Sequence, residues 1–130
     1  MKLIICAALA LGIAWLLNRF WLRLGLKEQL RVGYLAPLGE ELIKYVVATL
    51  FYLSLPFFYA CFGLGEGIYE TILIHKRLVI PLILAGVIVH LSSSVFFLLP
   101  LPLWMRLGLA IAAHLCWNNF VLVMNKHDHS

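Results

Sequence analysis

Long apolar runs, broken by short polar or proline-containing segments, dominate the pattern along the chain. The runs approach the ~17–25 residues with which a helix crosses a lipid bilayer. No alternation of apolar and polar positions lasts long enough for the strands of a barrel. Because lipid offers no partner to unpaired backbone groups, such runs predict helices, over residues 3–17, 37–55, 57–74, 79–99 and 103–124. The predicted fold class is all-α, a polytopic transmembrane helix bundle of about five spans that forms a single domain over residues 1–130.

Prolines and charges mark the expected helix ends. Pro37 is a residue type favoured in the first turn of a helix, and Pro56 is expected to end or kink the helix that begins there. The first run follows Lys2, as in a signal peptide, but no cleavage site is expected before Arg19. We therefore expect the first run to be retained as a membrane anchor.

Composition agrees with lipid as the surrounding solvent. Apolar residues make up 64% of the chain and charged residues only 12%, whereas soluble domains carry about 25% charged residues. Cys6, Cys61 and Cys116 stand singly in apolar stretches and are expected to be small buried thiols. The net charge of +4 comes from basic residues near segment ends, without an interleaved basic and aromatic surface. A nucleic-acid partner is therefore not predicted.

The basic residues also predict the orientation. In the five-span layout, one side of the membrane carries Arg19, Arg23, Lys27, Arg31, Lys76, Arg77 and Lys126. Lys2 and Arg106 lie near the other side. Because lysine and arginine accumulate on the cytoplasmic side of membrane proteins, we expect an outside N-terminus and a cytoplasmic C-terminus.

Ionisable residues inside the predicted spans are the candidates for chemistry. They are Glu40, Glu41, Glu66, Glu70, His90 and His114. Each such group costs roughly 2.5–3.5 kcal/mol at the bilayer centre on insertion scales, so a function is the expected reason for keeping them. Counted along their helices, they reach overlapping depths in the cytoplasmic half of the bilayer. The sequence therefore predicts one shared polar pocket there.

Helical spacing places several of these residues on common faces. The pairs three or four residues apart are Glu40 with Lys44, Glu41 with Lys44, Glu66 with Glu70, and His114 with Asn118. Two carboxylates stacked one turn apart disfavour each other's ionisation, which suits acid–base chemistry. The glycines at 63, 65 and 67 are expected to let a neighbouring helix approach closely.

Four short motifs resemble those of the PrsW family of intramembrane proteases, which is related to the CAAX prenyl endopeptidases. Gly39-Glu40-Glu41-Leu42-Ile43-Lys44 resembles the family's E-E-x-x-K motif. The segment from Gly63 to Thr71 is similar to its second motif, G-x-G-F-A-x-x-E-N, with Glu70 on the motif's glutamate. His90 resembles the histidine of the third motif, and His114-Leu115-Cys116-Trp117-Asn118 the closing H-x-x-x-N. The motifs follow one another between Pro37 and Asn118. This chain departs from the second motif at Glu66, Gly67 and Thr71, where the family has phenylalanine, alanine and asparagine.

The resemblance implies a protease of glutamic type in a bacterial-type plasma membrane, which hydrolyses a peptide bond of a membrane protein or peptide. Glu40 or Glu41 would activate a water as general base, and Glu70 or His90 would hold that water. His114 and Asn118 would donate to the oxyanion of the tetrahedral intermediate. Lys44 and Glu66 are expected to support these groups.

Metal dependence and two other functions stay open from the sequence. Glutamate and histidine sets bind zinc, and the ligands here would come from Glu41, Glu70, His90 and His114. Since the chain has no H-E-x-x-H motif, a metal-free mechanism is favoured. One alternative is a non-catalytic membrane module that binds a substrate helix or lipidated tail in the same pocket. Another is a proton-coupled carrier, because buried glutamates and histidines also form proton relays.

Overall fold

The computed structural model describes residues 1–73 and 79–127, and this part of the chain is helical except for short connections. In order, the elements are α1 (Lys2–Arg23), α2 (Glu28–Leu30), the π-helical turn η1 (Arg31–Leu35), α3 (Ala36–Leu50), α4 (Leu55–Leu73), α5 (Val79–Val95), the 3-10 turn η2 (Phe96–Leu98) and α6 (Leu103–His127). No strand occurs within the described ranges. The all-α prediction is therefore confirmed.

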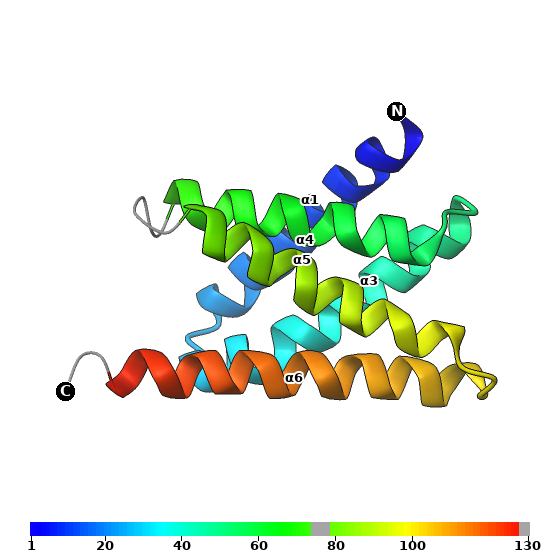
Figure 1. Ribbon diagram of the computed structural model, residues 1–130. Helices are drawn as coiled ribbons and strands as arrows, with labels where there is room; N and C mark the ends of the chain where they lie inside the picture. The colour runs from blue at the N-terminus through cyan, green and yellow to red at the C-terminus, as the bar shows by residue number, and fades with distance from the viewer. Residues whose placement is uncertain (74–78, 128–130) are drawn as a thin grey trace.

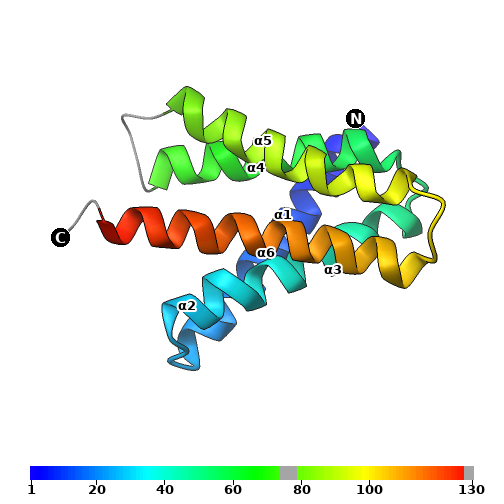
Figure 2. The same ribbon diagram turned by 60° about the horizontal axis from the view of Figure 1, so that its bottom comes forward.

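The long helices run back and forth between two ends of the molecule. Figure 1 shows α4 and α5 as an antiparallel hairpin, with α6 along one side and α1 crossing behind them. In the turned view of Figure 2, α3 lies below α6 and α1 passes behind α6, and α3 packs against both α1 and α6. In both views α1, α4 and α6 run one way along the molecule, and α3 and α5 run the other way. Chain direction thus alternates along the order of the predicted spans.

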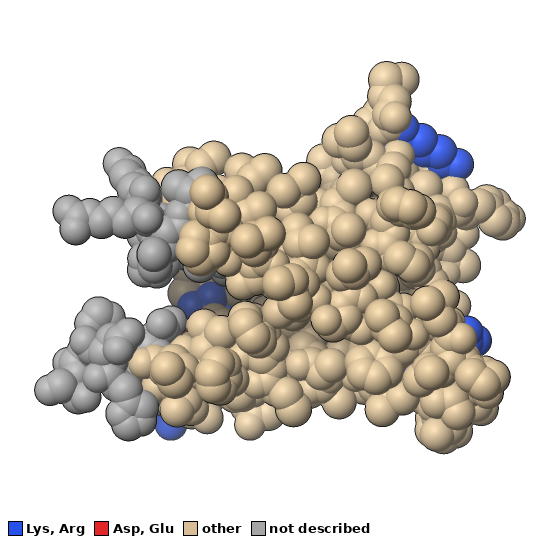
Figure 3. Space-filling view, viewed as in Figure 1, with Lys and Arg blue, Asp and Glu red and all other residues tan. Residues whose placement is uncertain are grey.

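Two helices among the described residues are long and apolar enough to cross a membrane. They are Lys2–Arg23 and Leu103–Met124, each of 22 residues, with mean hydropathies of 2.0 and 1.6. Only 17% and 11% of these stretches are buried within the molecule, so their apolar side chains face outward. The face in Figure 3 is formed almost entirely by uncharged residues, with lysine and arginine visible only toward its two ends. Apolar outer surfaces of this kind suit contact with lipid.

The apolar core lies where α1, α3, α4, η2 and α6 meet. Its fully buried members include Ala10 on α1, Ala48 on α3, and Phe58 and Phe62 on α4. The expectation of buried thiols is confirmed for Cys6, which joins this core, while Cys61 is half-buried and Cys116 is exposed. The expectation is wrong for Cys116, because this residue lies on the outward face of α6.

The predicted boundary at Pro56 is wrong. Helix α3 ends at Leu50 rather than at residue 55, and Pro56 instead occupies the first turn of α4. The end of α3 is a Schellman motif, in which Leu53 N–H donates to the Ala48 carbonyl (2.9 Å) and Tyr52 N–H to that of Thr49 (3.2 Å). Tyr52 takes the left-handed conformation of that motif, with φ +52°. The first turn of α4 accepts a proline because its N–H groups have no partner within the helix.

Helical structure before Pro37 was not predicted. The π-helical turn η1 runs directly into α3, and the Ala36 N–H donates to the Arg31 carbonyl, which leaves the Val32 carbonyl without that donor. Pro37 has no N–H for the Gly33 carbonyl. Side-chain amides from α6 replace both donors, since Asn118 Nδ2 reaches Val32 O (3.0 Å) and Asn119 Nδ2 reaches Gly33 O (2.9 Å).

Candidate active site

The structure brings six ionisable side chains of four helices into one cluster. They are Glu40, Glu41 and Lys44 of α3, Glu66 of α4, His90 of α5 and His114 of α6. Their hydrogen bonds and ion pairs form one continuous chain of neighbours, which we call the polar chain. All six were singled out in the sequence, four as catalytic candidates and Lys44 and Glu66 as supporting groups.

One half of the polar chain runs from α4 to α3 through His90. The Lys44 Nζ lies 2.7 Å from His90 Nδ1, and His90 Nε2 contacts a carboxylate oxygen of Glu66. An ammonium group only donates, so His90 Nδ1 accepts from it. The remaining ring proton is then on Nε2 and is donated to Glu66. Both ring nitrogens of His90 are thereby occupied.

The other half runs from Lys44 to Glu40 through Glu41 and His114. Lys44 and Glu41 form an ion pair one turn apart on α3. His114 Nδ1 lies 2.9 Å from the same oxygen of Glu41, and because a carboxylate accepts, Nδ1 carries the proton. The second nitrogen of His114, Nε2, lies 3.8 Å from an oxygen of Glu40. Neutral His114 therefore turns a lone pair toward Glu40.

Burial separates the ends of the polar chain from its middle. Glu41, Lys44 and His90 are 0% exposed and His114 is 2% exposed. The side chains of Glu66 and Glu40, at the two ends, are 28% and 14% exposed. The middle is sealed by aromatic rings, with Lys44 Nζ 4.6 Å from the ring centre of Tyr59 and 4.9 Å from that of Phe62. Only the ends are placed to meet another molecule.

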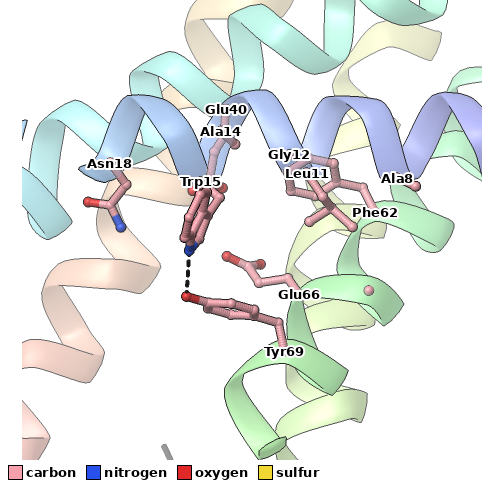
Figure 4. Close-up of a pocket in the computed structure, with 11 residues that line it drawn as sticks. Ala8, Leu11, Gly12, Ala14, Trp15, Asn18, Glu40, Phe62, Glu66 and Tyr69 are labelled. Atoms are coloured by element: carbon pink, nitrogen blue, oxygen red, sulfur yellow. Dashed lines mark hydrogen bonds between the residues drawn. The ribbon is translucent and has the colours of Figure 1, made fainter. Parts of the chain in front are cut away.

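A cavity of about 400 Å³ lies between α1 and α4, and both ends of the polar chain line it. Its wall consists of Ala8, Leu11, Gly12, Ala14, Trp15 and Asn18 of α1, Glu40 of α3, and Phe62, Gly65, Glu66 and Tyr69 of α4. In Figure 4, Glu66 reaches from α4 toward α1, and Glu40 approaches from behind α1. Trp15 Nε1–H donates to the Tyr69 hydroxyl (2.9 Å) and links the two helices across the cavity.

Glycines set the spacing that pairs Glu66 with His90. A Cβ added at Gly86 of α5 would lie 2.6 Å from the Gly63 carbonyl oxygen, and a Cβ at Gly63 would meet the Gly86 carbonyl and lie 2.9 Å from His90 Cδ2. The two backbones are thus in direct contact, as expected for Gly63. Since Glu66 follows Gly63 by three residues and His90 follows Gly86 by four, both side chains leave from the turns beside this contact.

The cluster does not fit a zinc site as it is arranged. Glu40, His90 and His114 each offer a ligand atom, and these atoms lie within 4.8 Å of one another. However, both nitrogens of His90 are used by Lys44 and Glu66. A divalent cation would have to displace the Lys44 ammonium and lie beside its positive charge. Glu41, a ligand candidate from the sequence, is held by Lys44 and His114.

The two remaining predicted catalytic residues are Glu70 and Asn118. The side chain of Glu70 lies outside the described part of the structure, and its backbone is on α4 one turn after Glu66. Asn118 donates to the Val32 carbonyl and holds η1 against α6. Its role as an oxyanion donor stays a prediction of the resemblance.

The contribution of α1 was missed in the sequence, where the first run is only an anchor. Ala8, Gly12 and Trp15 lie on one face at helical spacing and form a wall of the cavity. The sequence pattern that could have indicated a cavity wall is a row of small residues followed by an aromatic residue on one helix face. The same pattern is common wherever helices pack together. Tyr59 and Phe62, which cover Lys44, were also missed.

Comparison of the chain with protein-family models, with curated proteins and with solved structures finds no match. The interpretation as a PrsW-like protease therefore rests on the four motifs and on the arrangement of their residues.

Proposed function

We propose that this chain is an intramembrane protease that hydrolyses a peptide bond of a membrane-associated protein, with Glu40 as the general base. The observation that carries the proposal is the different placement of two adjacent glutamates. Glu40 lines the cavity, while Glu41 is 0% exposed and ion-paired with Lys44. A base must reach the water that it activates, and this favours Glu40 over Glu41.

The chemistry follows from this placement. The Glu40 carboxylate takes a proton from a water in the cavity as the water oxygen attacks the carbonyl carbon of the substrate. His114 Nε2 lies 3.8 Å from Glu40, and its lone pair is placed to accept the proton once Glu40 has taken it from the water. Removal of such a base typically lowers turnover by ~10²–10⁴-fold. No metal takes part in this proposal, because Lys44 and Glu66 occupy both nitrogens of His90.

The membrane setting extends the same proposal. Helices α1, α3, α4, α5 and α6 would each cross the bilayer, with the N-terminus outside and the C-terminus in the cytoplasm. Support comes from the alternating helix directions in Figures 1 and 2, from the apolar outer faces of α1 and α6, and from the asymmetry of basic residues. A substrate segment within the bilayer would enter the cavity between α1 and α4.

A carrier function finds less support in the geometry. A proton relay that serves transport must connect the two sides of a membrane. Among the described residues, the polar chain begins at Glu66 and ends at Glu40, and both line the same cavity. A proton that moves along this chain therefore leaves and re-enters the same cavity, as hydrolysis requires. A binding module would use the same cavity without turnover and is an outcome of the experiment below.

The experiment is cleavage of a membrane-tethered reporter by purified protein in lipid vesicles. The wild-type chain should cleave, and Glu40→Gln should reduce cleavage by ~10²–10⁴-fold. Glu28→Gln is the matched control, because Glu28 is exposed on α2, outside the polar chain. Binding of the reporter without cleavage by the wild-type protein would instead establish the binding module.

A further inference from the structure

Among the side chains that the structure describes, two carboxylates rather than one line the cavity. Glu40 comes from α3 and Glu66 from α4, and each contacts its own histidine, His114 and His90. The two histidine rings are in turn edge to face, with centres 4.9 Å apart. Paired carboxylates that flank a reacting bond supply a base and an acid in other hydrolases. Glu66 therefore has the position of a second reacting group.

We propose that Glu66 is the general acid of the reaction and that it protonates the leaving amine. This inference rests on the proposed function. The leaving nitrogen of a peptide needs a proton, because an amide anion is too basic to depart without one. Among the described side chains, Glu66 is the other carboxylate that lines the cavity, and 28% of its side chain is exposed. Its contact with His90 Nε2–H supplies the proton that it passes on.

The buried middle of the polar chain closes the proton cycle. Glu66, a carboxylate at rest, takes the Nε2 proton of His90 and passes it to the amine nitrogen as the C–N bond breaks. Lys44 then gives a proton to His90 Nδ1, 2.7 Å away. The proton that Glu40 took from water returns to Lys44 through His114 and Glu41. After one cycle every group has its original charge, and water and peptide have become a carboxylic acid and an amine. Each histidine then carries its proton on the other ring nitrogen, and a half-turn of each ring restores the starting hydrogen bonds.

The competing explanation is that Glu66 only holds His90 in place. A purely structural carboxylate would affect all substrates alike, because the base and the cavity would be disturbed together. An acid acts on the leaving group, so its removal should depend on how much that group needs a proton. An aryl ester departs as a stable phenolate and needs none. Comparing an amide with an aryl ester of the same acyl part therefore separates the two roles.

The test uses the full-length protein in lipid vesicles, with an apolar acyl anilide and the matching aryl ester. In Glu66→Gln, we expect amide turnover to fall by ~10²–10⁴-fold and ester turnover by less than about tenfold. In Glu40→Gln, both should fall by ~10²–10⁴-fold, since both need an activated water. Equal losses on the two substrates in Glu66→Gln, or unchanged amide turnover, would overturn the role of Glu66.

Two further measurements keep the result interpretable. If Glu66→Gln lacks a thermal unfolding transition, Glu66→Asp replaces it, because the shorter side chain withdraws the acid from the leaving nitrogen and keeps the charge beside His90. The same selective loss on the amide is expected, and equal losses would count against the proposal. Wild-type protein that cleaves neither substrate nor the tethered reporter would overturn the proposed function itself. Wild-type cleavage with an unaffected Glu66→Gln variant would overturn only the role of Glu66.

Discussion

The Glu41 carboxylate and the Lys44 ammonium form an ion pair one turn apart on α3, and both side chains are completely buried. Glu41 also accepts from His114, and Lys44 donates to His90. Isolated charges in an apolar interior are unstable, so each partner depends on the other. The pair joins α3 to α5 and α6 and thereby positions the groups that line the cavity.

Removal of one partner of this pair should destabilise the fold. Lys44→Met leaves the Glu41 carboxylate buried without its cation, and we expect a loss of about 3–5 kcal/mol in the free energy of unfolding. The double variant Lys44→Met/Glu41→Leu removes both charges and should recover much of that loss. Thermal unfolding in detergent measures both. A single variant as stable as the wild type would show that the ion pair does not hold the helices.

The contact between Gly63 and Gly86 should tolerate no side chain. In Gly86→Ala, the new Cβ would lie 2.6 Å from the Gly63 carbonyl oxygen, so α4 and α5 must separate. Overpacking of this kind costs about 1–3 kcal/mol, and the separation should weaken the pairing of Glu66 with His90 and lower turnover. Gly108→Ala is the control, because its Cβ would meet no atom within 4 Å. If both variants unfold at the same temperature, the close approach is not a structural requirement.

Turnover should not depend on a bound metal ion. Lys44 and Glu66 occupy the nitrogens of His90, so the proposed chemistry uses protons and a carboxylate base only. Dialysis against a strong chelator should leave the rate of reporter cleavage within about twofold of the untreated protein, well below the effect of losing a catalytic base. The check is the rate before and after chelation, followed by addition of zinc. A loss that zinc restores would establish a metalloenzyme.

The orientation can be tested with single cysteines in a variant that lacks Cys6, Cys61 and Cys116. Lys27→Cys should react with a membrane-impermeant maleimide only after the membrane is permeabilised, because the basic segment around it is expected in the cytoplasm. Leu101→Cys, between η2 and α6, should react in intact cells. The opposite labelling pattern would invert the orientation.

The sequence predicts the order of the helices and the meeting of four of them at one polar cluster. This succeeds because apolar runs fix helices and because buried charges require partners, which makes Glu41, His90 and His114 converge. Helical spacing predicts either Glu40 or Glu41 as the partner of Lys44, and in the structure the partner is Glu41.

Other features depend on packing that no local pattern encodes. Adjacent residues on a helix point about 100° apart, so Glu40 and Glu41 leave α3 in different directions, although both reach His114. Which of them faces the cavity is decided by where α1 and α4 pack. The π-helical turn before Pro37 is equally non-local, because it requires the amide groups of Asn118 and Asn119, more than eighty residues away in the chain.

The most direct measurement compares Glu40→Gln with Glu41→Gln, following reporter cleavage and thermal stability on the same samples. Glu40→Gln should fold as stably as the wild type and lose ~10²–10⁴-fold in turnover, because only the base is removed. Glu41→Gln should lose about 3–5 kcal/mol in the free energy of unfolding, because Lys44 loses its buried counter-charge. Reduced stability in both variants with no change in cleavage would contradict the proposal and show that both glutamates are structural.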